Sequence, residues 1–317
     1  MKEYKVLGNK DTRSGFGDGL AEAARRNPNV VALCADLTGS VKMDVFAKEF
    51  PERMIQCGIA EADMIGIAAG LALSGKVAFA SSFAAFATGR VYDQIRQAVA
   101  YSNTNVKIGG SHAGITLGED GATHQILEDL GLMKMLPNMV VLNPCDYNQT
   151  VAATIAAAEY EGPVYMRLGR LAVPVFNEEE GFEFEIGKGQ VVHEGNDITI
   201  IANGLMVKEA MDAAKIMEEK GVGVRVINMC TIKPLDNELV LKAAKETGRI
   251  ITAEEHSAIG GLGEAVCSLL SEKLPTPVKR IGVNDEFGHS GPAGALLKQF
   301  GLSAENIVAT AKEFCGK

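Results

Sequence analysis

Short apolar runs rich in β-branched residues alternate with helical patterns along almost all of this 317-residue chain. Runs of this length match strands, and the segments between them carry apolar residues at helical spacing. The expected strands span residues 30–34, 77–81, 106–109, 139–142, 164–168, 198–202, 224–229, 249–253 and 278–283. The expected helices include residues 91–101, 149–158, 207–220, 237–247 and 261–274. This alternation predicts an α/β protein with mainly parallel sheets that helices cover on both faces.

The length of the chain predicts two domains, each of which can bury its own core. An acidic run with several glycines, at residues 177–189, interrupts the alternation and is expected to cross between them. We therefore predict three-layer α/β/α domains at residues 1–177 and 190–317, joined by a linker at residues 178–189. Every candidate functional residue lies in the first domain, and the second shows no comparable cluster.

Composition excludes several classes of function. The net charge of −9 argues against nonspecific nucleic-acid binding. The most apolar window, near residues 64–73, is too short to span a membrane, and the amino-terminal residues lack the apolar core of a secretory signal. The six cysteines are widely separated and show no metal-ligand spacing, so we expect reduced thiols, a cytoplasmic protein and no metal site within this chain.

A glycine-rich segment at residues 118–125 reads Gly-Glu-Asp-Gly-Ala-Thr-His-Gln. It contains His124 and follows His112 closely, although the whole chain has only five histidines. Glycines let the backbone bend and approach a ligand, and binding groups often collect on such loops. A solvated loop with incidental polar residues is the alternative.

A second motif, Cys-Gly-Ile-Ala-Glu-Ala-Asp-Met-Ile-Gly at residues 57–66, leads into an apolar helix that ends near residue 73. Its small residues permit close packing, so this helix is expected to be buried. Glu61 lies in the first turn, where the helix dipole favours a carboxylate, and its neighbours are apolar. Glu61 is therefore either a desolvated functional acid or an ordinary first-turn acid.

Together these two motifs resemble the C-terminal half of the transketolase family. Further matches follow in the order of that family: Asp-Thr-Arg at residues 11–13, Ala-Asp-Leu-Thr-Gly-Ser at 35–40, Ser-Phe-Ala-Ala-Phe at 82–86 and Leu-Gly-Arg at 168–170. The resemblance covers essentially the whole chain. It implies a pyrimidine-binding domain followed by a transketolase C-terminal domain.

The resemblance implies that the chain binds thiamin diphosphate. Glu61 would share a proton with the N1′ atom of the aminopyrimidine ring, which activates the C2 carbon of the cofactor. Phe83 would stack on this ring and Phe86 would complete the aromatic wall, although core packing is the commoner fate of such residues. Leu37 would lie beneath the cofactor and Asp36 near its pyrimidine side.

The same resemblance implies roles in substrate binding and catalysis. His112 and His124 would bind the donor sugar and transfer protons, since histidine titrates near neutral pH. Asp120 would accept a hydrogen bond from a hydroxyl group of the donor. The neighbouring Glu119 is expected to face outward or to meet another subunit.

A phosphate site is implied at the far end of the substrate. Arg13 and Arg170 would bind the phosphate oxygens through their guanidinium groups, and the Ser40 hydroxyl would add a donor. Arg167 competes for this role, but Arg170 keeps the spacing of the family to Pro174.

These features predict the C-terminal subunit of a split transketolase that transfers a two-carbon ketol unit between sugar phosphates, as in the pentose phosphate pathway. A 1-deoxyxylulose-5-phosphate synthase-like subunit is the nearest alternative, and it shares the Tyr-Asp-Gln at residues 92–94. A 2-oxo acid dehydrogenase subunit fits less well, because its substrates need no phosphate-binding arginines. The remaining alternative is a non-catalytic relative that keeps the fold.

The chain lacks a complete motif for binding the diphosphate and its magnesium ion. Gly17-Asp18-Gly19 matches only the start of that motif, and residues 42–49 contain no asparagine to complete it. The chain also starts where the second domain of a full-length transketolase should start. We therefore expect a separate N-terminal subunit of roughly 250–300 residues that supplies the magnesium ligands, in an α₂β₂ assembly.

Overall fold

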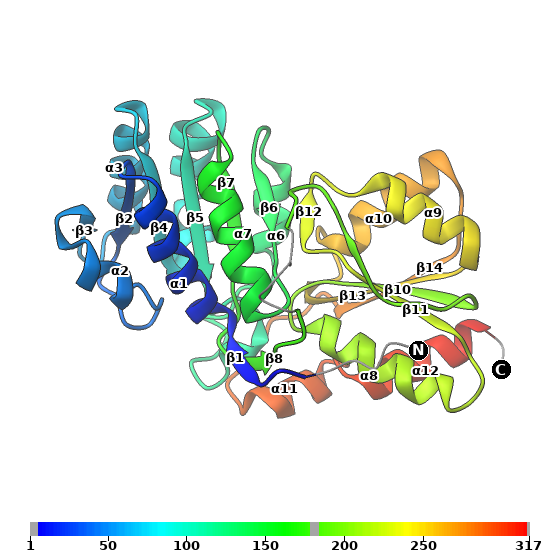
Figure 1. Cartoon of the computed structure of the whole chain (residues 1–317). Helices are drawn as coiled ribbons and strands as arrows, with labels where there is room; N and C mark the ends of the chain where they lie inside the picture. Colours follow the sequence, from blue (N-terminus) through cyan, green and yellow to red (C-terminus); the bar gives the residue numbers. More distant parts are fainter. Residues whose placement is uncertain (1–5, 178–183, 316–317) are drawn as a thin grey trace.

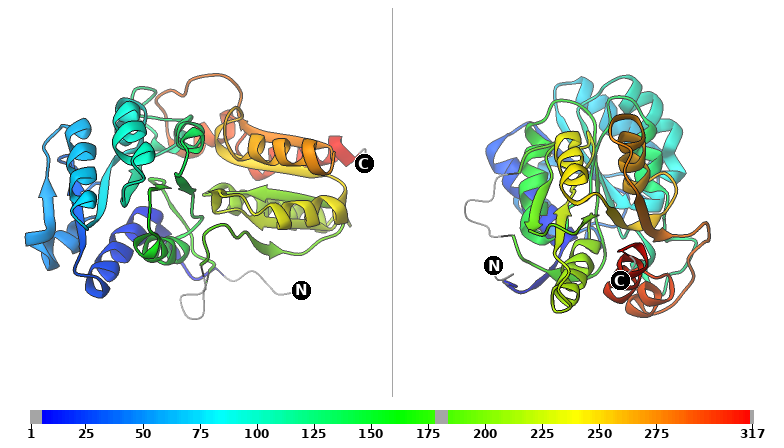
Figure 2. Two further views of the ribbon diagram at one scale, coloured as in Figure 1. Left: turned by 90° about the horizontal axis from the view of Figure 1, so that it is seen from above. Right: turned by 90° about the vertical axis from the view of Figure 1, so that its right-hand side faces the viewer.

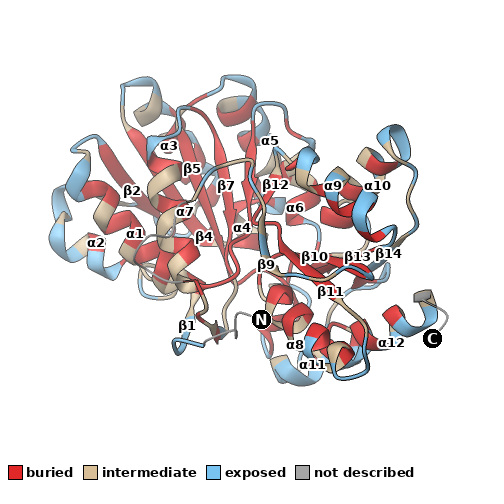
Figure 3. Cartoon of the chain, turned by 45° about the vertical axis from the view of Figure 1, so that its right-hand side comes forward, coloured by how far each residue is buried: buried red, intermediate tan, exposed pale blue. Residues whose placement is uncertain are grey.

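The computed structural model describes residues 6–177 and 184–315 and contains two α/β/α units that lie side by side (Figure 1). Each unit has a mainly parallel sheet with helices on both faces, as the alternation of apolar runs predicts. The central strands of both sheets are buried, whereas exposure is concentrated on the outer helix faces, the loops and the edge strands (Figure 3). Within the described ranges no helix has both the length and the hydropathy that a membrane crossing requires.

The first sheet has seven strands in the order β12-β6-β7-β5-β4-β2-β3. The six strands from the first half of the chain are parallel: β2 (Val30–Cys34), β3 (Met54–Gln56), β4 (Val77–Phe83), β5 (Val106–Ser111), β6 (Val140–Leu142) and β7 (Val164–Arg167). The seventh strand, β12 (Thr231–Lys233), comes from the second half of the chain and pairs antiparallel with β6. Short strands β1 (Asn9–Asp11) and β8 (Ala172–Pro174) form a separate pair.

Helices cover both faces of the first sheet (Figure 2). One face packs against α1 (Thr12–Arg26) and α7 (Tyr147–Glu159), and the other against α3 (Glu61–Leu73), as the two apolar clusters show. The remaining helical segments of this unit are α2 (Asp44–Glu49), η1 (Pro51–Arg53), α4 (Ala84–Ala87), η2 (Gly89–Val91), α5 (Tyr92–Gln94), η3 (Ile95–Tyr101), η4 (Ile115–Leu117) and α6 (Asp129–Met135). The helix expected at residues 91–101 is therefore present, and its second half has π-helical hydrogen bonding.

The Gly17-Asp18-Gly19 triplet lies inside α1, as the helical spacing around it indicates, and its environment shows that the glycines serve packing. A Cβ atom at Gly17 would collide with the carbonyl oxygen of Lys42, and one at Gly19 would lie 2.8 Å from a side-chain atom of α7. Asp18 accepts a hydrogen bond from the Tyr147 hydroxyl at 2.6 Å. The triplet is thus a feature of close helix packing.

The second sheet has the strand order β14-β13-β10-β11-β9. Its parallel strands are β10 (Ile198–Ala202), β11 (Val224–Asn228), β13 (Ile250–Ser257) and β14 (Val278–Val283), and β9 (Gln190–His193) is antiparallel at the edge. Its helices are α8 (Met206–Glu218), α9 (Asn237–Thr247), α10 (Leu262–Lys273), α11 (Ala293–Gln299) and α12 (Ala304–Cys315).

One apolar cluster continues from the first unit into the second. It joins Met64 and Ile65 of α3 to Ile201 of β10, Val240 of α9 and Leu262 of α10. Interfaces of this kind resist relative motion, because separating the units would expose apolar area to water. The predicted domain limits stay predictions, and residues 178–183 of the predicted linker lie outside the described residues.

All the expected strands are present, with ends that differ by a few residues. The strands that the periodicity does not predict are short edge or peripheral strands, namely β1, β3, β8, β9 and β12. Strands of three or four residues carry too few alternations to reveal a period.

Candidate active site

The candidate residues follow the carboxyl ends of parallel strands in the first sheet. In open α/β sheets ligands bind at this edge, because the loops that leave the strands converge there. The structure places at this edge Asp36 and Leu37 after β2, Glu61 after β3, Phe83 at the end of β4, His112 after β5 and Arg170 after β7. Residues far apart in the chain thereby come together.

Glu61 is the first residue of α3, and its side chain is only 4% exposed. One carboxylate oxygen accepts a hydrogen bond from Nη1 of Arg90 at 3.0 Å, and the other lies 3.4 Å from the Ser82 hydroxyl. The amino end of the helix also favours the negative charge. The desolvated environment expected for this carboxyl group is therefore present, but the sequence did not reveal its arginine partner.

Arg90 makes a second contact, with the aromatic wall. Its guanidinium carbon lies 3.9 Å from the centre of the Phe86 ring, and half of its side chain is exposed. A planar nitrogen-containing group thus stacks on Phe86 while it donates a hydrogen bond to Glu61. An aminopyrimidine ring would need the same two interactions. No pattern of the sequence identifies this contact, because α4 ends at Ala87 and Arg90 lies in the separate turn η2.

The aromatic residues form a continuous stack with both histidines. Phe83 and Phe86 have ring centres 5.9 Å apart at an angle of 15°, and the His112 ring lies 3.9 Å from Phe83. His124 contacts the edge of Phe86, with ring centres 5.2 Å apart. Phe83 and Phe86 are only partly buried, so both rings keep surface that a ligand can contact.

His112 is a buried, neutral imidazole. Its Nε2 atom lies 3.1 Å from Nη1 of Arg13, and its Nδ1 atom lies 2.8 Å from the Ser111 hydroxyl. An arginine can only donate, so Nε2 accepts, and Nδ1 carries the proton that it donates to Ser111. Burial, followed by repulsion from Arg13 and Arg170, lowers the pKa of His112 from 6.5 to about 3. The expectation that His112 titrates near neutral pH is therefore wrong.

Arg13 joins three segments of the chain next to His112. Its Nη1 atom donates to the carbonyl oxygen of Ser40 and its Nη2 atom donates to that of Arg170, both at 2.9 Å. Arg170 donates to the carbonyl oxygen of Leu117. Two guanidinium groups thus lie beside an uncharged imidazole. Each also has a carboxylate neighbour, since Nε of Arg13 is 3.4 Å from Asp11 and Nη1 of Arg170 is 3.4 Å from Glu119. Guanidinium groups are suited to bind phosphate oxygens, so this cluster is the candidate anion site.

Arg167 does not belong to the cluster of Arg13, Arg170 and His112. Its guanidinium group is buried and paired with the Asp129 carboxylate, with Nε at 2.9 Å from Oδ2. Burial opposes the charge of Arg167, but Asp129 and Glu255 raise its pKa overall. Arg167 therefore belongs to the contact between the two units, and the role of Arg170 stays a prediction.

The other candidates lie at the same edge but are more open. Asp36 is exposed in a left-handed backbone conformation, and its N–H donates to the Gln56 side chain at 3.2 Å. Leu37 is half-buried against the apolar core. Asp120 and Glu119 are exposed, and Glu119 lies 3.4 Å from Arg170. The structure does not bring Asp36, Leu37 or Asp120 into the aromatic stack, and their roles stay predictions.

A metal ion would need a cluster of ligands. Among the described residues no three side chains of histidine, cysteine, aspartate or glutamate gather closely enough to hold one.

The comparisons with known proteins agree with this geometry. The family model of the transketolase pyrimidine-binding domain matches residues 9–175, and that of the transketolase C-terminal domain matches residues 187–307. The chain belongs to the transketolase family. It is 49% identical over 300 residues to a putative transketolase C-terminal section of Methanocaldococcus jannaschii. The match covers 94% of this chain and 94% of the relative.

Two further relatives match along nearly their whole length. One of the subunits of the apulose-4-phosphate transketolase of Phocaeicola vulgatus is 45% identical, and the match covers 96% of this chain and 97% of the relative. The solved structure of a split-gene transketolase, an inactive β4 tetramer, is 48% identical with a TM-score of 0.89 and covers 96% of this chain and 98% of the other. The thiamin-diphosphate-dependent family and the fold expected from the motifs are confirmed.

The charge environment of His112 leads to a test. Replacement of Arg13 by alanine should raise the pKa of His112 above about 3, because it removes a neighbouring positive charge. Burial is the larger cause, so the value should stay below 6.5. Nuclear magnetic resonance of labelled histidine would measure it, with the Arg26→Ala variant at the exposed end of α1 as control. An unchanged His112 titration in Arg13→Ala would contradict this electrostatic account.

Proposed function

We propose that this chain is the C-terminal subunit of a split thiamin-diphosphate-dependent transketolase that transfers a two-carbon ketol unit between sugar phosphates. One observation carries the proposal. The cluster of Arg13, Arg170 and His112 lies beside Phe83 of the aromatic stack, and Arg90 links Phe86 of this stack to Glu61. A phosphorylated substrate bound by the two arginines would therefore extend toward the residues proposed to hold the cofactor.

The site fits the aminopyrimidine ring of thiamin diphosphate. Glu61 would hold the ring nitrogen and share a proton with it, while Phe83 would stack on the ring and Phe86 would complete the aromatic wall. Arg90 already makes both kinds of contact, so it would have to turn toward solvent, which its exposed side chain allows. When bound, the cofactor supplies a carbon nucleophile that attacks the ketose carbonyl group.

The remaining residues would act on the sugar. His124 is only partly buried at the edge of the aromatic wall, and there it would accept the proton of a donor hydroxyl group. His112 would act as an uncharged hydrogen-bonding partner, and Asp120 would accept a hydrogen bond from a donor hydroxyl group. The arginines would anchor the distal phosphate, and this remote binding energy would orient the reacting carbons.

The surface of α3 supports a partner subunit. This helix was expected to be buried, but one face is exposed: Ala62, Gly66 and Gly70 lie open there, and Leu73 is 76% exposed. The neighbouring Ile59 is 80% exposed. Apolar patches of this kind are typical of protein interfaces. We propose that an N-terminal subunit covers this region beside Glu61 and supplies the magnesium ligands, in a cytoplasmic α₂β₂ assembly.

The role of Glu61 can be tested with an isosteric amide. Glu61→Gln should keep the fold but lower turnover by about 10²–10⁴-fold, because the amide cannot share a proton with the ring nitrogen. Glu272→Gln, the same change at an exposed acid of α10 in the second unit, serves as the matched control and should retain activity. Hydrogen–deuterium exchange at the C2 carbon of the cofactor measures the step directly. Exchange at the wild-type rate in Glu61→Gln would show that Glu61 has another role.

The proposed phosphate site at Arg13 and Arg170 can be tested with pairs of phosphorylated and unphosphorylated substrates. Arg170→Ala and Arg13→Ala should weaken binding of phosphorylated sugars by roughly 1.5–3 kcal/mol and affect unphosphorylated analogues much less. His124→Ala should instead lower turnover more than it changes phosphate affinity. Steady-state kinetics with both substrate types would separate these effects. An equal loss for both types in the arginine variants would indicate a structural role.

The need for a partner can be tested on the isolated chain. Calorimetry should show little binding of thiamin diphosphate in the presence of magnesium, since we expect the diphosphate and metal ligands on the other subunit. No ketol transfer should occur until that subunit is added. Robust transfer by this polypeptide alone would overturn the split-enzyme proposal.

A further inference from the structure

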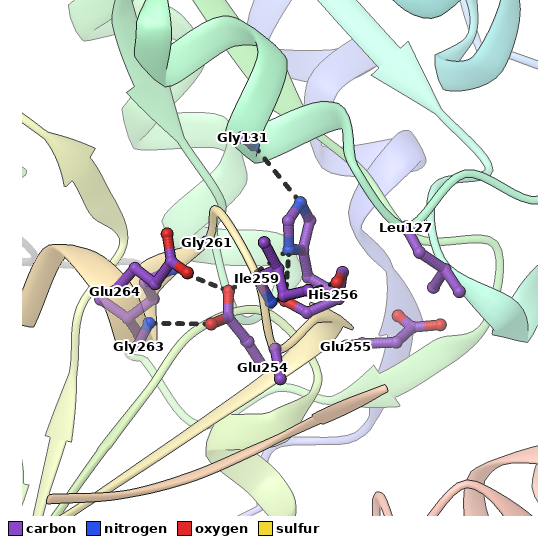
Figure 4. A network of polar contacts seen from close by, with 12 residues as sticks. Leu127, Gly131, Glu254, Glu255, His256, Ile259, Gly261, Gly263 and Glu264 are labelled. Carbon is purple, nitrogen blue, oxygen red and sulfur yellow. Dashed lines mark hydrogen bonds and ion pairs between the residues drawn. The ribbon is translucent and has the colours of Figure 1, made fainter. Parts of the chain in front are cut away.

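The loop that carries the candidate substrate residues rests on the C-terminal domain. We call residues 112–128 the histidine loop, because it begins at His112 and contains His124. The end of β13 supplies Glu254, Glu255 and His256, which are all at least 97% buried. Figure 4 shows these side chains pointing in different directions from the end of this strand.

Glu255 holds the first part of the histidine loop. One oxygen of its carboxylate accepts the backbone N–H of Thr116 at 2.8 Å. The loop approaches this carboxylate so closely at Gly114 that a Cβ atom there would collide with it, and the φ angle of +85° also favours glycine. A buried acid thus fixes the backbone two to four residues after His112.

The position of Glu255 is itself fixed by the first domain. Its carbonyl oxygen accepts a hydrogen bond from Nη2 of Arg167 at 2.7 Å, and its second carboxylate oxygen lies 3.9 Å from Nη1 of Arg167. Arg167 is also bound to the buried Asp129. A carboxylate that is paired in this way retains a defined orientation although it is buried.

Further contacts hold the other end of the loop. The Ser257 N–H donates to the carbonyl oxygen of Leu127 at 2.7 Å, and Gln125 donates to the carbonyl oxygen of His289 at 3.1 Å. Just beyond the loop, the Gly131 N–H donates to the ring of His256. The C-terminal domain therefore contacts the loop on both sides of Asp120 and His124.

Glu254, the neighbour of Glu255, serves a different purpose. Its two oxygens accept the N–H groups of Leu262 and Gly263 at 2.8 Å, which caps the first turn of α10. Among these buried acids, Glu255 is the one whose carboxylate bonds the histidine loop. Two adjacent acids of β13 thus have different roles: Glu254 caps a helix, and Glu255 binds the loop.

We infer that Glu255 is a positioning residue, by which the C-terminal domain holds the histidine loop in the arrangement that substrate binding and cleavage need. The importance for catalysis rests on the proposed function, whereas the effect on the loop does not. Two substitutions separate the length of the Glu255 side chain from its charge. Glu255→Gln keeps an oxygen within reach of Thr116, and Glu255→Asp keeps the charge near Arg167 but withdraws it from the loop.

Hydrogen–deuterium exchange of the full chain, read by mass spectrometry on peptides from residues 112–126, tests the inference. Glu255→Asp should speed exchange in this segment by about tenfold, because Thr116 loses its acceptor. Glu255→Gln should remain close to wild type, and Asp63→Asn serves as a surface control. A loop loosened equally by both variants, or more by Glu255→Gln, would overturn the inference, as would a loop unaffected by either.

The assembled enzyme provides the second readout. Glu255→Asp should lower turnover of a ketose phosphate about tenfold and leave exchange at the cofactor C2 carbon unchanged, since that exchange depends on Glu61. Equal turnover in Glu255→Asp and wild type would overturn the catalytic part of the inference. Absence of ketose cleavage by the assembled wild type would instead overturn the proposed function. Hydrogen–deuterium exchange in the histidine loop would still test whether Glu255 positions it.

Discussion

The common direction of strands β2 to β7 is the constraint on which the site depends. Because these strands are parallel, their carboxyl ends meet at one edge, and each following loop starts beside its neighbours. Arg13 reinforces this convergence from the start of α1, since one guanidinium group binds carbonyl oxygens from two later loops. The active-site candidates are thus fixed by main-chain geometry first and by side-chain contacts second.

The second domain contributes more than a separate fold. An apolar cluster runs through both sheets, and β12 adds a strand from the second half of the chain to the first sheet. The buried Arg167–Asp129 pair, with Tyr165 donating to Asp129 at 2.6 Å, lies at this contact beside Glu255. Polar groups buried so deeply require hydrogen-bonding partners in fixed positions. This network therefore holds the two domains together beside the histidine loop.

Sequence patterns predicted the elements that are long and periodic, as well as the residues that lie in recognisable motifs. They did not predict β12, whose three residues pair with a strand almost 90 positions earlier. They also missed Arg90 and Glu255, because the important contact of each is with a residue far away in the sequence. Arg90 contacts Glu61, 29 positions away, and Glu255 contacts Thr116, 139 positions away. Likewise, the neutral state of His112 follows from burial and two arginines that only the fold brings close.

The exposed face of α3 illustrates the opposite case, in which the sequence predicts burial that the structure of the single chain shows only in part. A helix that is apolar on almost every side indicates burial on every side. In the single chain this burial is complete only toward the sheet, as Gly66 and Gly70 show. The composition of this helix therefore supports the partner subunit proposed to cover its exposed face.

The contact of Arg90 with Glu61 and Phe86 has a thermodynamic consequence. A ligand that needs the same carboxylate and the same ring face cannot simply add to this site, because it must exchange places with the guanidinium group. The measured affinity is then the difference between two sets of similar interactions, and it is weaker than the ligand contacts alone would suggest. Glu61 would thereby keep a hydrogen-bonding partner with and without the proposed cofactor, and the buried acid would never be left unpaired.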